Sequence, residues 1–412
     1  MIMDKKIVIT GVGVLAPNAI GKDNFWQALK EGKSGIKPIT IFNPGLFKSQ
    51  KAGEISDFKA EEFLGPKGLQ NVDRATKLVC SAAKLALEDS ELQITERNTD
   101  SIGVVTGTTL SLWNVAELSR EMVEDGPQFV TAGIFPGTTI NSASSQISIR
   151  HKIKGFNTTI STGYTASLDA LKYAVNFIKL GRAKAVLVAG VEGLTFAGFT
   201  GFYKIGFLAG IKGEEISCPF DKRRNGIILS EAAVVLVVED AEYAKARGAR
   251  VYAELTAVEN SFDAFRAAKY EPQAAGLKRT MVKALKSSGL HQEDIDCVFS
   301  AANSVVQQDI LETKAIREVF NIYADKTPVT AIKSMVGESF SASGILQLAA
   351  ALGCFEKNFI PPTINYQEKD SSCDLDYVPN QSREQELNNI MINNFGPGGN
   401  NATVVVKNHG GE

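Results

Sequence analysis

Short apolar segments typical of strands alternate with longer helical segments along almost the whole chain. Residues 6–11 read KIVITG, and residues 185–189 and 234–238 are equally apolar. Apolar residues at helical spacing mark 165–180 and 343–355. A strand that is apolar at every position has no polar face, so helices must cover both faces of the sheets. The alternation therefore predicts an α/β fold built in layers.

The series of strands and helices divides near residue 255. Each half carries its own strands and helices, and each has a glycine-rich turn between a strand and a helix. This pattern predicts an internally duplicated fold, with one half over 1–254 and the other over 255–412. No long proline-rich or serine-rich linker marks the boundary.

Composition excludes several classes of function. The formal net charge is −2 over 412 residues, and no basic stripe of the kind that nucleic acids require is visible. No signal-peptide core and no run of 18 apolar residues occurs, so we expect a cytoplasmic protein without a membrane partner. The five cysteines form no CxxC pair, which argues against a metal site.

The segment from Gly11 to Ala16 matches the dinucleotide fingerprint GxGxxG/A only superficially. Pro17 and Asn18 follow at once, so no helix N-terminus stands ready to hold a pyrophosphate. We favour a tight glycine turn beside the sheet and expect no cofactor.

The stretch 161–167, which reads STGYTAS, is the most informative part of the sequence. It joins a strand at 157–160 to the helix at 165–180. A strand-to-helix turn of this kind presents its central side chain at a helix N-terminus, where such elbows hold activated nucleophiles. Here the central residue is Tyr164, a poor acyl nucleophile with an ordinary pKa near ~10. We favour a space-filling role for Tyr164.

Three further features bear on catalysis. Lys333 follows a strand and could either act in catalysis or pair with a buried carboxylate such as Glu312 or Glu338. The glycine loop at 393–401 could be an ordinary hairpin, but its glycine content favours a loop whose backbone faces a pocket. The only histidines are His151, in a basic surface run, His291 and His409, and none is near the elbow in sequence. A Ser/Cys–His relay is therefore hard to build.

These stretches together resemble the β-ketoacyl-[acyl carrier protein] synthase family of the thiolase fold. The similarity runs from KKIVITGVGVLAP near the start to NNFGPGGNNATVVVK near the end, and 218–255, PPTINY and CDLDYVPN are its most specific segments. The resemblance implies a five-layered αβαβα architecture with two pseudo-repeated halves. It also implies that an elbow cysteine carries the acyl chain and that two histidines assist decarboxylation.

At the matching positions this chain departs from the family. The elbow cysteine matches Tyr164, and the two histidines match Ala301 and Glu338, while the lysine is retained as Lys333. The phenylalanine that gates the active site in the family matches Pro397. The resemblance therefore implies a scaffold without nucleophile, electrophile or proton donor.

A chain that keeps the scaffold of the family but lacks its catalytic residues resembles the chain-length factor of type II polyketide synthases. Such subunits commonly carry glutamine at the elbow, where this chain has tyrosine. This resemblance implies a heterodimer with an active ketosynthase, served by an acyl carrier protein. It implies that tunnel-lining residues lie at matching positions, namely Leu110, Trp113, Ile134, Phe135 and Pro397. Two alternatives remain open: an acyltransferase or condensing enzyme that uses Lys333, Glu338 or Tyr164, and a homodimer that only binds acyl chains.

Overall fold

The computed structural model describes residues 5–109 and 113–410. Its main feature is one sheet of eleven strands, ordered β11-β10-β14-β15-β9-β1-β8-β7-β5-β6 with β2 paired to β1. The strands of the main path are β1 (Ile7–Ala16), β5 (Ile102–Gly107), β6 (Asn157–Ile160), β7 (Ala185–Glu192), β8 (Ala232–Asp240), β9 (Ala253–Phe262), β10 (Cys297–Phe299), β11 (Val329–Thr330), β14 (Asn389–Phe395) and β15 (Asn400–Asn408).

The strand order repeats itself on the two sides of the β1–β9 contact. Outward from β1, the order is β1-β8-β7-β5-β6, and outward from β9 it is β9-β15-β14-β10-β11. In both series the first two pairings are antiparallel and the last two are parallel. The predicted internal duplication of the fold is thus present in its connectivity. The boundary predicted at 254/255 falls just inside β9, and as a division of the chain it stays a prediction.

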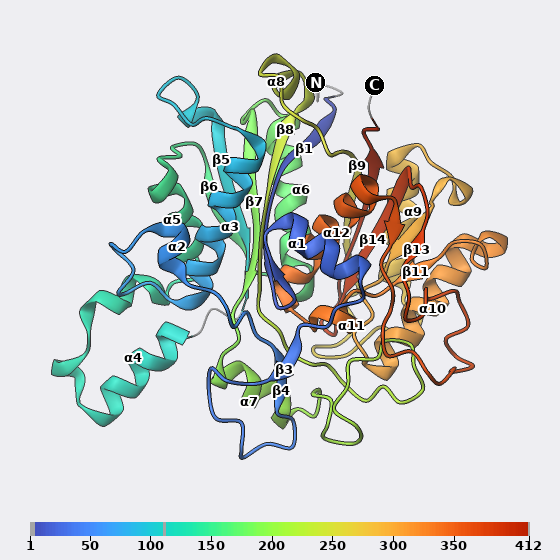
Figure 1. The fold of residues 1–412 in the computed structure, drawn as a ribbon, viewed down its shortest axis with the longest axis horizontal. Helices are drawn as coiled ribbons and strands as arrows, with labels where there is room; N and C mark the ends of the chain where they lie inside the picture. Colours follow the sequence, from blue (N-terminus) through green and yellow to red (C-terminus); the bar gives the residue numbers. More distant parts are fainter. Residues whose placement is uncertain (1–4, 110–112, 411–412) are drawn as a thin grey trace.

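Helices form three layers around the two half-sheets (Figure 1). The central layer consists of α6 (Ala166–Lys179) and α12 (Ser343–Lys357), which contact strands of both halves. On the outside, α3 (Arg74–Ser90) and α5 (Ser142–His151) cover the first half-sheet, and α9 (Ala275–Ser288) and α10 (Val306–Phe320) the second. The predicted five-layered αβαβα architecture is confirmed.

Alternation along the strands explains why the sheets need cover on both faces. In β7, Val186 and Val188 point into the central core with α6 and α12, whereas Leu187 and Ala189 point into the outer core with α3. All four side chains are fully buried. Successive side chains of a strand point to opposite faces of the sheet, so a strand that is apolar at every position needs a helical layer on each face.

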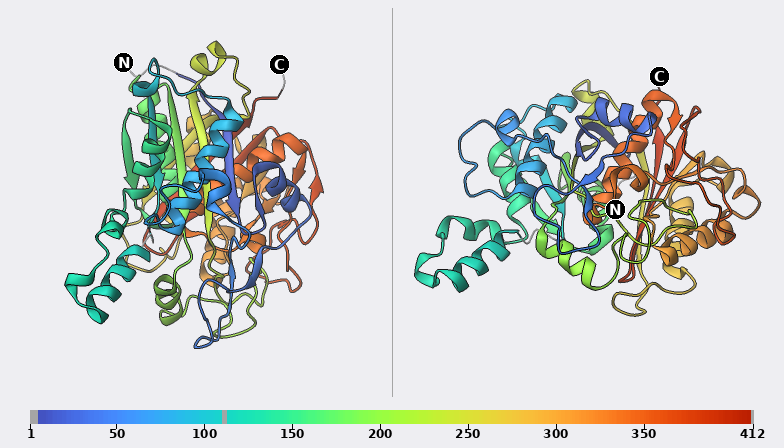
Figure 2. Two further views of the ribbon diagram at one scale, coloured as in Figure 1. Left: turned by 60° about the vertical axis from the view of Figure 1, so that its left-hand side comes forward. Right: turned by 60° about the horizontal axis from the view of Figure 1, so that its bottom comes forward.

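The remaining elements are shorter and lie around this core. They are β2 (Ala19–Ile20), α1 (Lys22–Lys30), β3 (Ile36–Pro38), β4 (Lys51–Gly53), α2 (Ala60–Leu64), α4 (Trp113–Glu124), α7 (Phe196–Lys204), α8 (Ala241–Ala246), α11 (Lys333–Val336), β12 (Phe359–Ile360), β13 (Arg383–Glu384) and the 3₁₀ turns η1 to η7. Of these, α4 stands away from the body together with η2 (Pro127–Phe129) and η3 (Ala132–Thr138), as both views in Figure 2 show. We call residues 113–141 the arm.

The glycines of the dinucleotide-like segment serve packing rather than a turn. Gly11 and Gly13 lie inside β1, so the predicted tight turn is wrong. A Cβ on Gly13 would come within 1.9 Å of the carbonyl oxygen of Ala82, and one on Gly11 within 2.5 Å of that of Ala86. The two glycines let α3 approach the strand closely. This use of the motif agrees with the expectation that the segment is not a dinucleotide site.

Contact between α12 and α1 generates a prediction about Gly353. Glycine to alanine normally stabilises a helix interior by up to about 1 kcal/mol. At Gly353, however, the new Cβ would lie 2.2 Å from Cδ1 of Trp26, whose indole N–H also donates to the Ala349 carbonyl at 2.8 Å. We expect Gly353→Ala to lower the free energy of unfolding by about 1–3 kcal/mol in a denaturant titration, because the core is already full.

Gly201→Ala is the matched control for this prediction. Gly201 lies in α7, and a Cβ added there would meet no atom within 4 Å. The substitution should leave stability unchanged or raise it by up to about 1 kcal/mol. Equal effects of the two substitutions would contradict the close packing of α12 on Trp26.

Candidate active site

The elbow predicted at 161–167 is present and places Tyr164 at the start of α6. The strand β6 ends at Ile160, and η4 (Gly163–Thr165) leads directly into α6. Gly163 has a φ of 71°, a left-handed conformation that the turn requires and glycine adopts without strain. The turn is held by Asp169, whose carboxylate accepts hydrogen bonds from the hydroxyls of Thr165, at 2.7 Å, and Thr162.

The Tyr164 ring is enclosed by the glycine hairpin and by Phe340. Only 5% of Tyr164 is exposed. A Cβ on Gly396 would come within 2.2 Å of the ring, and the Phe340 ring lies 4.3 Å away, centroid to centroid. The Asn394 amide donates to the Tyr164 carbonyl at 3.0 Å. Burial, and after it the negative charge of Glu338, raise the pKa of Tyr164 well above its ordinary value, so the phenol is not a nucleophile near neutral pH.

The glycine loop is a tight hairpin between the antiparallel strands β14 and β15. Gly398 and Gly399 have positive φ values, and half-buried Pro397 lies at the turn. The backbone of the hairpin lies against the Tyr164 ring, so the space that the loop faces is filled by that ring.

Lys333 and Glu338 form a buried ion pair. The ammonium nitrogen Nζ lies 2.9 Å from Oε2 of Glu338 and donates a second bond to the carbonyl of Ala301 at 3.0 Å. Each of the two charged residues is 1% exposed. Of the two roles left open for Lys333, the structure shows the pairing, with Glu338 as the partner.

The Glu338 carboxylate accepts two further hydrogen bonds. The side-chain amide of Asn303 donates to Oε2 at 2.8 Å, and the backbone N–H of Phe340 donates to Oε1 at 2.9 Å. A buried ion pair is stable only when its remaining donors and acceptors are satisfied, and both oxygens of Glu338 meet this condition. The negative charge of Glu338 is thereby held in place between Lys333, Asn303 and the Phe340 backbone.

Ala301 and Glu312 complete the buried cluster. Ala301 follows β10 and offers only a methyl group, while its backbone N–H donates to Oε1 of Glu312 at 3.1 Å. Glu312 also accepts from the Ser300 hydroxyl at 2.6 Å and from the Asn393 amide at 3.3 Å. Burial raises the pKa of Glu312 to about 7, and that of neighbouring Asp309 to about 6, although several donors oppose the shift.

No histidine belongs to this cluster within the described part of the chain. His151 ends α5, His291 caps η5 (Gln292–Asp294), and His409 lies in the C-terminal tail. The prediction that His151 lies on a basic surface is only partly right, because its ring is half-buried and burial lowers its pKa. This cluster of described residues therefore consists of a buried tyrosine, an alanine methyl group and a lysine whose charge is paired with a glutamate. It contains no nucleophile–base pair.

Of the predicted tunnel residues, Pro397 follows Gly396 in the hairpin that packs on the Tyr164 ring, whereas Trp113, Ile134 and Phe135 belong to the arm. Ile134 and Phe135 belong to η3 on the arm, where Phe135 is 60% exposed. Ile134 lines a cavity of about 370 Å³ together with Ile41 and Leu194. Leu110 lies outside the described residues, and Trp113 is the first residue of α4. Their role in a tunnel stays a prediction.

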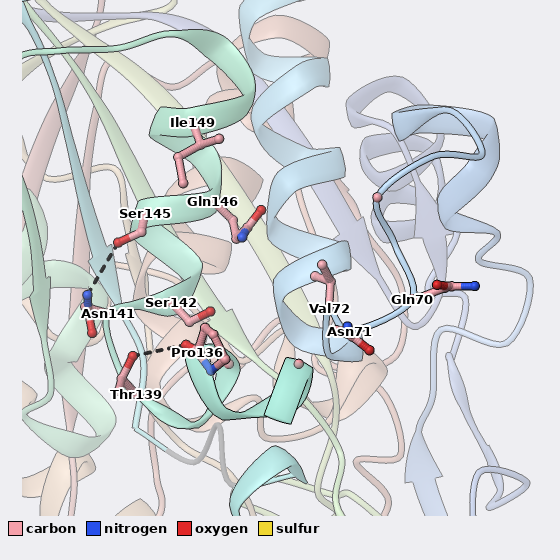
Figure 3. A pocket seen from close by; sticks show the side chains of 13 residues that line it. Gln70, Asn71, Val72, Pro136, Thr139, Asn141, Ser142, Ser145, Gln146 and Ile149 are labelled. Carbon is pink, nitrogen blue, oxygen red and sulfur yellow. Dashed lines mark hydrogen bonds between the residues drawn. The ribbon is translucent and has the colours of Figure 1, made fainter. Parts of the chain in front are cut away.

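A further cavity of about 530 Å³ lies between the loop before α3 and the helix α5 (Figure 3). Its lining is mostly amide and hydroxyl side chains, including Gln70, Asn71, Ser142 and Gln146. It adjoins η3 of the arm through Pro136 and contains none of the residues that match catalytic positions. Among the described residues, no helix is long and apolar enough to cross a membrane.

The internally duplicated five-layered fold and the elbow at the start of α6 define a condensing-enzyme scaffold of the thiolase type. Two family models match this chain: the N-terminal domain of β-ketoacyl synthase over residues 4–244 and its C-terminal domain over residues 252–367. The chain is 36% identical over 406 residues to 3-oxoacyl-[acyl-carrier-protein] synthase 2 of Coxiella burnetii, with 98% of both chains covered. The chain therefore belongs to the β-ketoacyl synthase family.

Two solved structures are also similar over almost the whole chain. One is the ishigamide ketosynthase/chain length factor, with a TM-score of 0.92, 29% identity and coverage of 98% of this chain and 100% of that one. The other is a type II polyketide synthase acyl-carrier protein in complex with its ketosynthase bound to the hexaketide. Its match has a TM-score of 0.88 and 27% identity, and covers 98% of this chain and 100% of that one.

Sequence reasoning missed two members of the site. Phe340 lies against Tyr164, and Asn303 binds Glu338, but neither was singled out. The signal was weak, because a phenylalanine or an asparagine in a loop indicates no particular chemistry.

The ion pair generates a prediction about stability. Lys333→Met should lower the free energy of unfolding by about 3–5 kcal/mol, because it leaves the Glu338 carboxylate buried without its cation. Lys333→Met combined with Glu338→Gln should be clearly less destabilising, because no buried charge is left and the single amide oxygen can still accept from the Phe340 N–H. Denaturant unfolding of the parent, the double variant, Lys333→Met and Glu338→Gln measures this coupling; additive losses would contradict a direct pair.

A second prediction concerns pH. The folded-state pKa of Glu312 is about 7, above the ordinary value, so its contribution to stability is full below the unfolded pKa and is lost as pH rises toward 7. Glu312→Gln should therefore reduce the loss of unfolding free energy between pH 5 and pH 8, by on the order of 2 kcal/mol. Unfolding titrations across this range measure the effect. Glu61→Gln, on the exposed face of α2, is the control and should leave the profile unchanged.

Proposed function

We propose that this chain is a non-catalytic ketosynthase-like subunit that pairs with an active ketosynthase and shapes the tunnel for a growing polyketide chain. The observation that carries the proposal is the buried Lys333–Glu338 pair beside Ala301 and Tyr164. These four residues occupy the positions at which the family carries a lysine, two histidines and the acylated cysteine.

Decarboxylative condensation demands groups that these side chains cannot supply. It needs a nucleophile that becomes a thioester, but Tyr164 is buried and its pKa is raised. It needs donors for the enolate, which develops negative charge. Glu338 places a fixed negative charge there instead, and Ala301 has no polar side chain. Lys333 donates to Glu338 and to a backbone carbonyl, so its charge is already neutralised.

The surface around β6 supports a role in an assembly. This strand is the edge of the eleven-stranded sheet, and its residues are half-buried or exposed. On the neighbouring arm, Val123 is 84% exposed, Phe129 68% and Phe135 60%. An open strand edge and exposed apolar side chains are both features that proteins normally cover with a partner. In Figure 2 the arm extends well beyond the body.

The partner in this proposal is an active ketosynthase with an intact cysteine and two histidines. An acyl carrier protein would bring substrate to that partner. The similar structures are compatible with this arrangement, because one is a ketosynthase/chain length factor and the other a carrier protein bound to its ketosynthase. This chain would contribute the far wall of the tunnel from Leu110, Trp113, Ile134, Phe135 and Pro397. A bulky wall stops elongation because a packed surface cannot accept another two-carbon unit without strain.

A direct test uses the purified chain with malonyl-loaded carrier protein. Alone, the chain should form no acyl adduct in intact-mass analysis and release no carbon dioxide. Products should appear only when the active ketosynthase is added. An adduct or turnover by the chain alone would instead indicate an enzyme with altered chemistry. Acyl-chain binding by a stable homodimer that never joins a ketosynthase would also overturn the proposal.

Tyr164→Cys provides the control variant for this experiment. It restores a thiol at the elbow but leaves Ala301 and Glu338 unchanged. We expect no decarboxylation by this variant alone, since the donors for the enolate are still missing. A cytoplasmic location stays a prediction from the sequence.

A further inference from the structure

Three aromatic rings lie in a row between α7 and the start of α6. The Tyr164 ring lies 4.3 Å from that of Phe340, which lies 5.6 Å from that of Phe202 on α7. Tyr164 is buried, whereas Phe340 and Phe202 are half-buried. The row therefore leads from the surface to the residue at the elbow, and Phe340 covers the Tyr164 ring on this side.

The backbone of Phe340 is held in an unfavourable conformation. Its φ is 50°, in the left-handed region that bulky side chains avoid. Such strain persists only where surrounding contacts impose it. Two contacts hold this backbone: the Phe340 N–H donates to Oε1 of Glu338 at 2.9 Å, and the Phe340 carbonyl accepts from the Ser343 hydroxyl at 2.8 Å. Glu338 is in turn fixed by Lys333 and Asn303.

The hairpin offers no aromatic ring to close the same space. The position that matches the gating phenylalanine of the family is Pro397, and the neighbouring Gly396 has no side chain. The ring that covers Tyr164 on this side therefore comes from η7 (Phe340–Ala342), which follows Glu338 in the chain.

We propose that Phe340 is a stopper that covers the buried elbow at Tyr164 and keeps thioester-bearing ligands from reaching it, and that Glu338 is its positioning residue. The inference deepens the proposed function and rests on it. Lys333 and Glu338 thus act through Phe340 to keep the elbow covered. A thioester delivered by a carrier protein then cannot reach the elbow of this chain, and loading is confined to the elbow of the active partner.

The test places a reporter thiol behind the stopper. In a Tyr164→Cys parent, the rate of alkylation by iodoacetamide is followed by peptide mass spectrometry. The thiolate sulfur forms a bond to the methylene carbon as iodide leaves. The five native cysteines are all buried, and they report general loosening of the protein in the same sample.

Adding Phe340→Gly should raise the alkylation rate of the new thiol by roughly tenfold or more, with no rise at the native cysteines. Glycine removes the ring and adopts the positive φ freely. Phe340→Ala is the second variant, and it should give the same direction of change. An unchanged rate, or an equal rise at the native cysteines, would overturn the stopper.

A matched pair of variants tests the positioning role of Glu338. Both carry Tyr164→Cys and Lys333→Met, so neither leaves an unpaired lysine. With Glu338→Gln the Phe340 N–H keeps an oxygen acceptor, and the rate should stay near that of the parent. With Glu338→Leu the acceptor is lost, and the rate should rise toward that of Phe340→Gly. Equal rates in the two variants would overturn the positioning role. These assays use the chain alone and measure no turnover, so turnover without a partner would refute the proposed function and leave this readout intact.

Discussion

The buried ion pair between Lys333 and Glu338 organises the centre of this molecule. Two opposite charges leave water together only if each is matched and the remaining lone pairs are satisfied. Here the pair holds Asn303 through one carboxylate oxygen and the Phe340 backbone through the other. The lysine binds the Ala301 carbonyl as well. One interaction thus connects the segment after β10, the turn of α11 and the turn η7 that precedes α12.

The layered fold explains how distant segments meet at this pair. Parallel strands β10 and β11 end at the same edge of the second half-sheet, so the residues that follow them become neighbours. The elbow after β6 occupies the corresponding place in the first half, where α6 and α12 share the central layer. The same scaffold can therefore carry either a catalytic triad or the filled site of this chain. The difference lies in a few side chains, because function resides in the site rather than in the fold.

The sequence was sufficient for most of the fold but for less of the site. Apolar strands and helical spacing identified the layers, and the elbow at Tyr164 followed from its place between a strand and a helix. The segment from Gly11 to Ala16 was misinterpreted as a turn, because glycine allows both a turn and close packing of a helix on a strand. The arm was not foreseen as a separate helical projection, because its amphipathic helix has the same pattern as one that packs on a core.

What the amino-acid sequence determined by itself is the residue types at 164, 301 and 338: a tyrosine, an alanine and a glutamate, none of which is a thiol nucleophile or a cationic donor. That conclusion needs no coordinates, because it depends only on the pKa and the charge of each side chain. The tertiary structure decided which contacts these side chains make. From the sequence, Lys333 had two candidate partners: Glu312, which is distant in the chain, and Glu338, which follows soon after Lys333. Only the fold brings the Glu338 oxygen to 2.9 Å and turns the other oxygen toward Phe340. Contacts of this kind depend on the distances between segments, which the order of residues along the chain does not contain.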